Sequence, residues 1–182
     1  PQELELMKMK KSILVALTAA LVMLSMAGSA WALSLNPFKR AGRTRAHTLM
    51  VTGNYVESRL LVELAQYRTK QPVLLFSPDV DGSQQLFYLQ SGGKATSMDS
   101  EKYLEFIEFI NPKRIVFLGG DDFVPPAFVD MARSRYSVMI LDSKDWLKNA
   151  SMLADWLKHR QLVRQYQEFR ERLAESGIRA ED

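Results

Sequence analysis

The feature that most constrains the fold is a series of short, almost entirely apolar segments that alternate with helical patterns. Four of these segments are predicted to be strands, at residues 47–52, 73–76, 114–118 and 138–141. A strand that is buried on both faces is apolar throughout, and helices between such strands supply the crossovers that parallel pairing needs. The sequence therefore predicts an α/β fold: a layered, mostly parallel sheet with helices on both faces.

Apolar residues spaced three and four apart predict the helices. The expected helices cover residues 54–68, 99–110 and 144–176, with another that begins at Pro125-Pro126, and a short edge or hairpin strand is expected at 85–90. Asn54 is the expected cap of the first helix, because its side chain can accept hydrogen bonds from N–H groups that the first turn leaves free. Proline is tolerated at the start of a helix, where its missing N–H group has no partner to lose.

Residues 7–32 have the pattern of a secretory signal peptide. Lysines at positions 8, 10 and 11 precede an apolar run at 13–26, and Ala30-Trp31-Ala32 places small residues before a cleavage site. The run is shorter than the ~20 residues that a transmembrane helix needs, although extending it through residue 32 makes an uncleaved anchor the alternative. Residues 1–6 do not fit this pattern, because two glutamates oppose its positive charge. The protein is expected to be exported, to the periplasm or the cell surface.

The remaining residues, 33–182, are enough for one domain with a hydrophobic core. Subtracting the three lysines and two glutamates of residues 1–32 leaves 21 basic and 19 acidic residues, a weak indication of a polyanionic partner. The basic residues of segment 33–46 are Lys39, Arg40, Arg43 and Arg45. This segment is expected to be a flexible basic leader that touches anionic lipid or an acidic polymer, and a solvated linker is the alternative.

Several chemistries are disfavoured by what the sequence lacks. The chain has no cysteine and only two histidines, which argues against disulfides, thiol catalysis and a histidine-rich metal centre. Neither glycine-rich nucleotide-binding motif occurs, nor does the G-x-S-x-G nucleophile turn. No cofactor is expected, and an enzyme is the less favoured class. Nucleic acid is not an expected partner, because export removes the usual targets and the aromatic residues follow core-like patterns.

In an open parallel sheet, a binding site is expected at the carboxyl ends of the strands. Gly, Asp and Ser follow the predicted strands at 52–55, 77–79, 119–122 and 142–145. The same residue types are common in ordinary turns between strands and helices, so both interpretations stay open. A divalent ion is one possible ligand of the strand-end aspartates, which are Asp79, Asp81, Asp121, Asp122 and Asp142.

The last predicted helix carries an apolar seam in the segment 158–182. Its members are Leu162, Tyr166, Phe169 and Leu173, at spacings of four, three and four. Such spacing is found in short coiled coils, so self-association through this seam is one expectation. Packing of the same face on the chain's own domain, residues 47–157, is the other.

Five segments follow one another in a characteristic order: VTGNYVESRLL at 51–61, KQPVLL at 70–75, PKRIVFLGG at 112–120, VPPAFV at 124–129 and DWLKNA at 145–150. Over about residues 48–157, this order resembles the repeat of the cell-wall-binding type 2 family, which is found in exported Gram-positive surface proteins. The closing segment departs from the family motif, with Asn149 in place of threonine. An insertion near 79–98 is a further departure.

The resemblance implies an α/β unit that binds anionic cell-wall polymers noncovalently and without catalysis. Family repeats usually occur as three in tandem, whereas this chain has one copy, so it is expected to form a homo-oligomer, aided by residues 162–173. The expected ligand contacts are Asn54, Tyr55, Arg59, Asp121 and Asp122, together with the basic leader. An exported hydrolase or small-molecule-binding protein that uses the strand-end aspartates is the alternative function.

Overall fold

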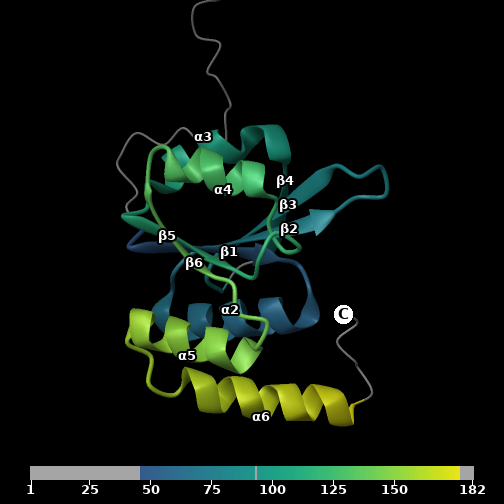
Figure 1. Ribbon diagram of the computed structural model, residues 1–182, viewed down its shortest axis with the longest axis vertical. Coiled ribbons are helices and arrows are strands. Elements are labelled where there is room, and N and C mark those ends of the chain that lie inside the picture. Colours follow the sequence, from purple (N-terminus) through teal and green to yellow (C-terminus); the bar gives the residue numbers. More distant parts are fainter. Residues whose placement is uncertain (1–45, 93, 177–182) are drawn as a thin grey trace, which may run out of the picture. The chain divides into compact units, whose positions relative to one another are not determined.

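The computed structural model describes residues 46–92 and 94–176. The predicted signal peptide and the four basic residues of the predicted leader lie outside the described residues. Six strands form one sheet in the order β4-β3-β2-β1-β5-β6 (Figure 1). The strands are β1 (Thr48–Gly53), β2 (Val73–Pro78), β3 (Gln84–Leu89), β4 (Ala95–Asp99), β5 (Arg114–Leu118) and β6 (Ser137–Leu141).

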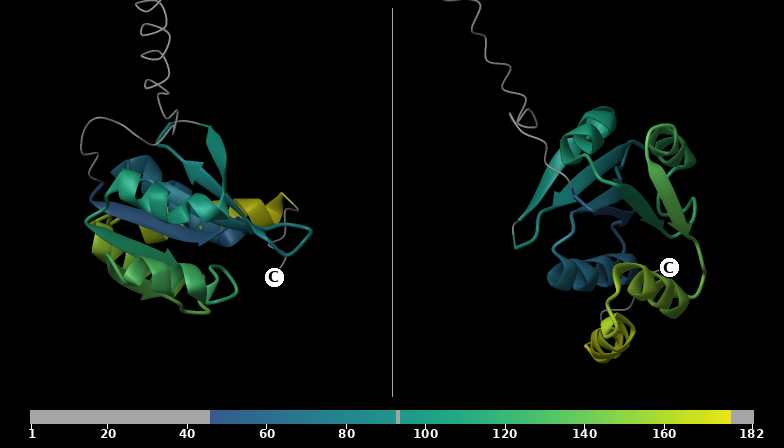
Figure 2. Two further views of the ribbon diagram at one scale, coloured as in Figure 1. Left: turned by 90° about the horizontal axis from the view of Figure 1, so that it is seen from above. Right: turned by 90° about the vertical axis from the view of Figure 1, so that its left-hand side faces the viewer.

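Helices cover both faces of this sheet. They are α2 (Val56–Thr69), α3 (Tyr103–Ile110, which follows the 3-10 turn η1, Ser100–Lys102), α4 (Pro126–Arg133), α5 (Trp146–Leu157) and α6 (Leu162–Glu175). Helices α3 and α4 lie on one face, α2 and α5 lie on the other, and α6 packs outside α2 and α5 (Figures 1 and 2). Strands β2, β1, β5 and β6 are mutually parallel. The predicted α/β class, with a mostly parallel sheet and helices on both faces, is confirmed.

The central strands are buried because helices cover both sides of them. All six residues of β1 are buried, and so are the first four of β2. Met50, Val73 and Val116 belong to the core cluster that also contains residues of α2, α5 and α6. On the other face, the ring of Phe76 lies 4.8 Å from the ring of Phe128, between centroids. Continuous apolar strands in the sequence thus correspond to two-sided burial.

The short strand expected at 85–90 is β3, which forms a hairpin with β2, one of the two arrangements expected for it. β3 pairs antiparallel with β2, and β4 pairs antiparallel with β3 at the edge of the sheet. Met98 is the buried residue of β4, and the other four residues are exposed. A strand with one buried side chain has no apolar pattern to recognise, so β4 was not expected from the sequence.

The prediction of one unbroken helix over 144–176 is wrong. Helix α5 ends at Leu157, and Lys158 takes the left-handed conformation with φ 56°. The chain then turns, and α6 runs back along α5 and α2 (Figure 1). Leu162 and Tyr166 become fully buried in this way. Burying two large side chains outweighs the roughly 1–2 kcal/mol that a left-handed residue costs.

The packing of α6 buries part of the predicted apolar seam and leaves the rest exposed. Leu162 and Tyr166 face the chain's own core, so they are not available to another molecule. Phe169 keeps 42% of its surface exposed, and Leu173 is half-buried. The four residues therefore do not form one continuous exposed seam.

Among the described residues, no helix combines the length and the apolar character that a bilayer span requires.

Candidate functional site

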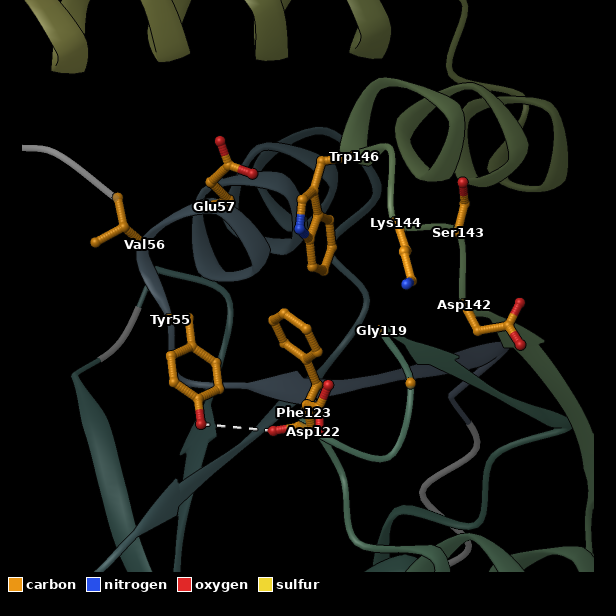
Figure 3. A pocket seen from close by; sticks show the side chains of 11 residues that line it. Tyr55, Val56, Glu57, Gly119, Asp122, Phe123, Asp142, Ser143, Lys144 and Trp146 are labelled. Carbon is orange, nitrogen blue, oxygen red and sulfur yellow. Dashed lines mark hydrogen bonds between the residues drawn. The ribbon is translucent and has the colours of Figure 1, made fainter. Parts of the chain in front are cut away.

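A cleft opens where the strand order of the parallel sheet reverses. From β1 the chain proceeds to β2 on one side, and later to β5 on the other side of β1. The carboxyl ends of β1 and β5 adjoin, with Thr52 opposite Leu118. Ligands of open α/β sheets bind at such a switch point. The cleft has a volume of about 650 Å³ and is lined by residues of three connections, within 55–57, 119–123 and 142–146 (Figure 3).

Three aromatic rings form a row along the cleft. The Tyr55 and Phe123 rings meet edge to face with centroids 5.1 Å apart, and the Phe123 and Trp146 rings do so at 5.0 Å. The Tyr55 hydroxyl donates a long hydrogen bond of 3.5 Å to the carbonyl oxygen of Asp122. Tyr55 is 38% exposed, so part of this row is accessible from solvent.

Two glycines allow the rings to lie directly on the backbone. Gly119 has φ +84°, and a Cβ atom there would overlap the Phe123 ring. A Cβ atom on Gly53 would come within 2.7 Å of the Tyr55 ring. A larger residue at either position would require the neighbouring ring to move. The glycine that ends β1 and the glycine that follows β5 therefore shape the aromatic wall as well as the turns.

Hydrogen bonds from three buried side chains hold the loops around the cleft. Thr52 Oγ1 donates to the Leu118 carbonyl at 2.8 Å, which ties the ends of β1 and β5. Ser58 Oγ donates to the Gly53 carbonyl at 2.6 Å. In the β6–α5 loop, Asn149 Nδ2 donates to the Ser143 carbonyl at 2.7 Å, and its Oδ1 accepts from the Ser143 amide at 3.0 Å. Thr52, Ser58 and Asn149 are fully buried, so the site is built on a rigid frame.

The charged residues of the cleft are Glu57, Asp122, Asp142 and Lys144. Arg170 of α6 pairs with Glu57, whereas Asp122, Asp142 and Lys144 are exposed around the opening. Carboxylates accept hydrogen bonds from hydroxyl groups, and the lysine ammonium donates them. Together with the aromatic row, this arrangement suits a ligand that has both apolar faces and many hydroxyl groups.

The structure brings some of the predicted site residues into the cleft and leaves others outside. Tyr55 and Asp122 line it. Asn54 does not cap α2, because the cap position is Tyr55, and that helix has no side-chain cap. Arg59 pairs with Glu63 at 2.7 Å, on the exposed side of α2, and reaches Asn54 at 3.5 Å.

The five strand-end aspartates do not converge. Asp122 and Asp142 share the cleft, and Asp121 lines a smaller adjoining pocket of about 160 Å³ that Asp142 also borders. Asp79 and Asp81 lie in the β2–β3 turn, where their side chains accept from the amides of Val80 and Ser83. The bonds from Ser83 lower the pKa of Asp81. In the part of the chain that the structure describes, no three acidic or histidine residues are placed to hold a metal ion.

The residues that sequence reasoning missed are Glu57, Phe123, Lys144 and Trp146. Phe123 had a usable signal, since it is a large aromatic residue that directly follows two glycines and two aspartates in a strand-end loop. Trp146 had none, because a tryptophan in the first turn of an amphipathic helix equally suits the core.

Comparison with known proteins finds no matching family model, no matching curated protein and no matching solved structure. The class of this protein is therefore defined by its own topology: a doubly wound α/β domain with an aromatic cleft at the switch point of its sheet. The resemblance to the cell-wall-binding repeat stays a prediction.

Proposed function

We propose that this protein is an exported envelope protein that binds a cell-wall or envelope polymer noncovalently, with a saccharide unit of the polymer held in the cleft. The observation that supports this function is the row of Tyr55, Phe123 and Trp146 along the switch-point cleft. The proposal also agrees with the signal-peptide pattern and with the family resemblance of the sequence.

A sugar ring presents C–H groups on its faces and hydroxyl groups around its edge. The C–H faces can lie against aromatic rings, which offer large rigid surfaces. The edge hydroxyls can donate to Asp122 and Asp142 and accept from Lys144, all of which border the cleft. Its volume of about 650 Å³ lies within the usual range for small-ligand pockets, so it suits a short part of a polymer.

The charge of the polymer is a separate question from the fit of its sugar. The cleft lining carries three carboxylates and one lysine, with Glu57 already paired to Arg170. An anionic group has little to attract it there. We therefore assign contacts with phosphate or carboxylate groups of the polymer to the basic leader, Lys39–Arg45. Binding should weaken as salt rises, because exposed charges are screened beyond about 10 Å at 0.1 M salt.

A homo-oligomer stays part of this proposal, but not through the whole predicted seam. Leu162 and Tyr166 are occupied within the domain, so any contact through α6 falls to Phe169 and its neighbours.

The test is co-sedimentation of the purified full chain with protein-free envelopes and with extracted envelope polymers, across a salt series. Tyr55→Ala should reduce affinity about tenfold, because it removes one end of the aromatic row. Tyr67→Ala is the matched control, since Tyr67 is 79% exposed on α2 and lies outside the cleft. Absence of binding to every polymer, or equal binding by Tyr55→Ala and the wild type, would overturn the proposal.

The same experiment distinguishes simple polymer binding from the alternative function, which is that of an exported hydrolase. The observation in its favour is that Asp122 and Asp142 both border one cleft. Shortened polymer products in the wild-type supernatant that disappear with Asp122→Asn or Asp142→Asn would favour hydrolysis. Retention of intact polymer would favour simple binding.

A further inference from the structure

The C-terminal helix α6 contacts a residue of the cleft. Arg170 Nε lies 2.7 Å from the Glu57 carboxylate, and Glu57 belongs to the first turn of α2 as well as to the cleft lining. The Glu57 side chain is 21% exposed, less than any other side chain in the ion pairs of the described residues. The Arg170 side chain is 45% exposed, so the pair is partly solvated and only its Glu57 end is shielded from solvent.

Helix α6 also supports a second wall of the cleft. Trp146, the first residue of α5, packs against the core cluster that contains Leu162 and Tyr166 of α6. Figure 3 shows Glu57 and Trp146 together on one side of the pocket, with Asp122 on the opposite side. One helix thus adjoins two of the elements that form the cleft.

The attachment of α6 to the rest of the domain is mainly apolar, through its packing on α2 and α5. Leu162 and Tyr166 are its buried residues, and the Tyr166 hydroxyl is buried without a hydrogen-bond partner. Other side-chain pairs of α6, such as Arg164 with Glu168, stay within the helix. Within residues 46–92 and 94–176, the Arg170–Glu57 pair is the ion pair that joins α6 to another helix.

We propose that Arg170 is a positioning residue for the cleft. When α6 is docked, Arg170 holds the first turn of α2 through Glu57, and Leu162 and Tyr166 complete the core cluster against which Trp146 packs. Occupation of the cleft and docking of α6 then stabilise each other, because both require the same arrangement of these two elements. The part of this inference that concerns a ligand rests on the proposed polymer binding. A partner that removed α6 from the domain would weaken that binding.

The binding test uses purified, protein-free peptidoglycan sacculi and the full chain. Arg170→Ala should lower affinity about fivefold, the lower end of typical coupling between sites. Arg164→Ala is the matched control, because it removes an arginine from the same helix without touching α2, and it should bind like the wild type. Unfolding midpoints of each variant establish that the protein is folded in every measurement.

A charge swap distinguishes positioning from direct contact. The double variant Glu57→Arg with Arg170→Glu re-forms the pair with its charges exchanged. Recovery of affinity shows that the pair acts by docking α6. Failure of the swap to recover affinity overturns the positioning role, and so does wild-type affinity of Arg170→Ala.

A ligand-free measurement keeps this inference separate from the proposed function. In a chain labelled with 5-fluorotryptophan, the fluorine resonance of Trp146 should shift or broaden in Arg170→Ala and stay unchanged in Arg164→Ala. If the wild type does not bind sacculi, binding to peptidoglycan is wrong, and the Trp146 resonance alone decides whether α6 positions the cleft. An unchanged resonance in Arg170→Ala overturns the inference whatever the binding result.

Discussion

The ring of Phe123 meets the ring of Trp146 edge to face, with centroids 5.0 Å apart and planes 67° apart. Phe123 lies in the connection after β5, and Trp146 is the first residue of α5, after β6. Their contact therefore ties together two loops that neighbouring parallel strands deliver to the same edge of the sheet. Tyr55 extends the row from the connection after β1.

Replacing Phe123 with leucine should destabilise the domain by about 1–3 kcal/mol, because each of its two edge-to-face contacts contributes roughly 0.5–1.5 kcal/mol. Urea unfolding followed by circular dichroism gives the change in unfolding free energy. Phe169→Leu is the control, since Phe169 is exposed on α6, and its change should be within about 0.5 kcal/mol. Equal losses in the two variants would mean that the ring contacts do not stabilise the loops.

Gly119→Ala should be more destabilising than Gly82→Ala. Both glycines have positive φ, +84° and +83°, so both substitutions carry the roughly 1–2 kcal/mol of a left-handed alanine. Only at Gly119 would the new Cβ also overlap a side chain, that of Phe123, whereas nothing lies within 4 Å at Gly82. The difference in unfolding free energy between the two variants measures the overlap. A difference of zero would show that the Phe123 ring moves aside freely.

Asn149→Ala should cost about 1–3 kcal/mol of stability, because it leaves the Ser143 amide and carbonyl without their buried partner. The same change should loosen the β6–α5 loop, which hydrogen exchange of residues 142–146 would detect. Gln167→Ala removes an exposed side-chain amide of α6 and provides the control. Unchanged exchange in Asn149→Ala would contradict the anchoring role of this side chain.

His159 should make stability fall in mild acid. Burial, and then the charge of Arg68, lower the pKa of His159, and its buried Nε2 atom has no hydrogen-bond partner. The folded state therefore binds the proton less readily than the unfolded state, whose histidine titrates near pH 6.5. The stability that neutral His159 contributes is complete above pH 6.5. It declines as the pH falls through 6.5 toward the lower pKa of the folded state.

The measurement is the unfolding free energy between pH 5 and 8. His159→Gln should flatten the acid side of the profile. A wild-type profile that matches His159→Gln across this range would show that the histidine does not contribute.

Much of the fold was predictable because burial on two faces leaves a continuous apolar run in the sequence. β5 was predicted at 114–118 and occupies Arg114–Leu118, and β1 differs from its prediction by one residue at each end. The start of α4 at Pro126 follows from the fixed geometry of proline. Patterns of this kind depend on a residue and its near neighbours, so they can be recognised without the rest of the chain.

The break between α5 and α6 could not be predicted in the same way. An amphipathic pattern continues across Lys158 and His159, and only the surface offered by α2 and α5 makes turning back favourable. Strand β4 is a similar case. It has no apolar pattern in the sequence, and it is a strand because it pairs with β3.

The α/β class, the main strands and the edge of the sheet where a site was expected follow from the sequence. Which side chains meet at that edge depends on the tertiary fold, because Tyr55, Phe123 and Trp146 come from three separate connections. The tertiary fold also decided that Asp79 and Asp81 stay in a turn and that Glu57 pairs with Arg170 from the far end of the domain's sequence. The physical reason is that local patterns record whether a residue is buried, whereas contacts between loops depend on strand order and helix packing.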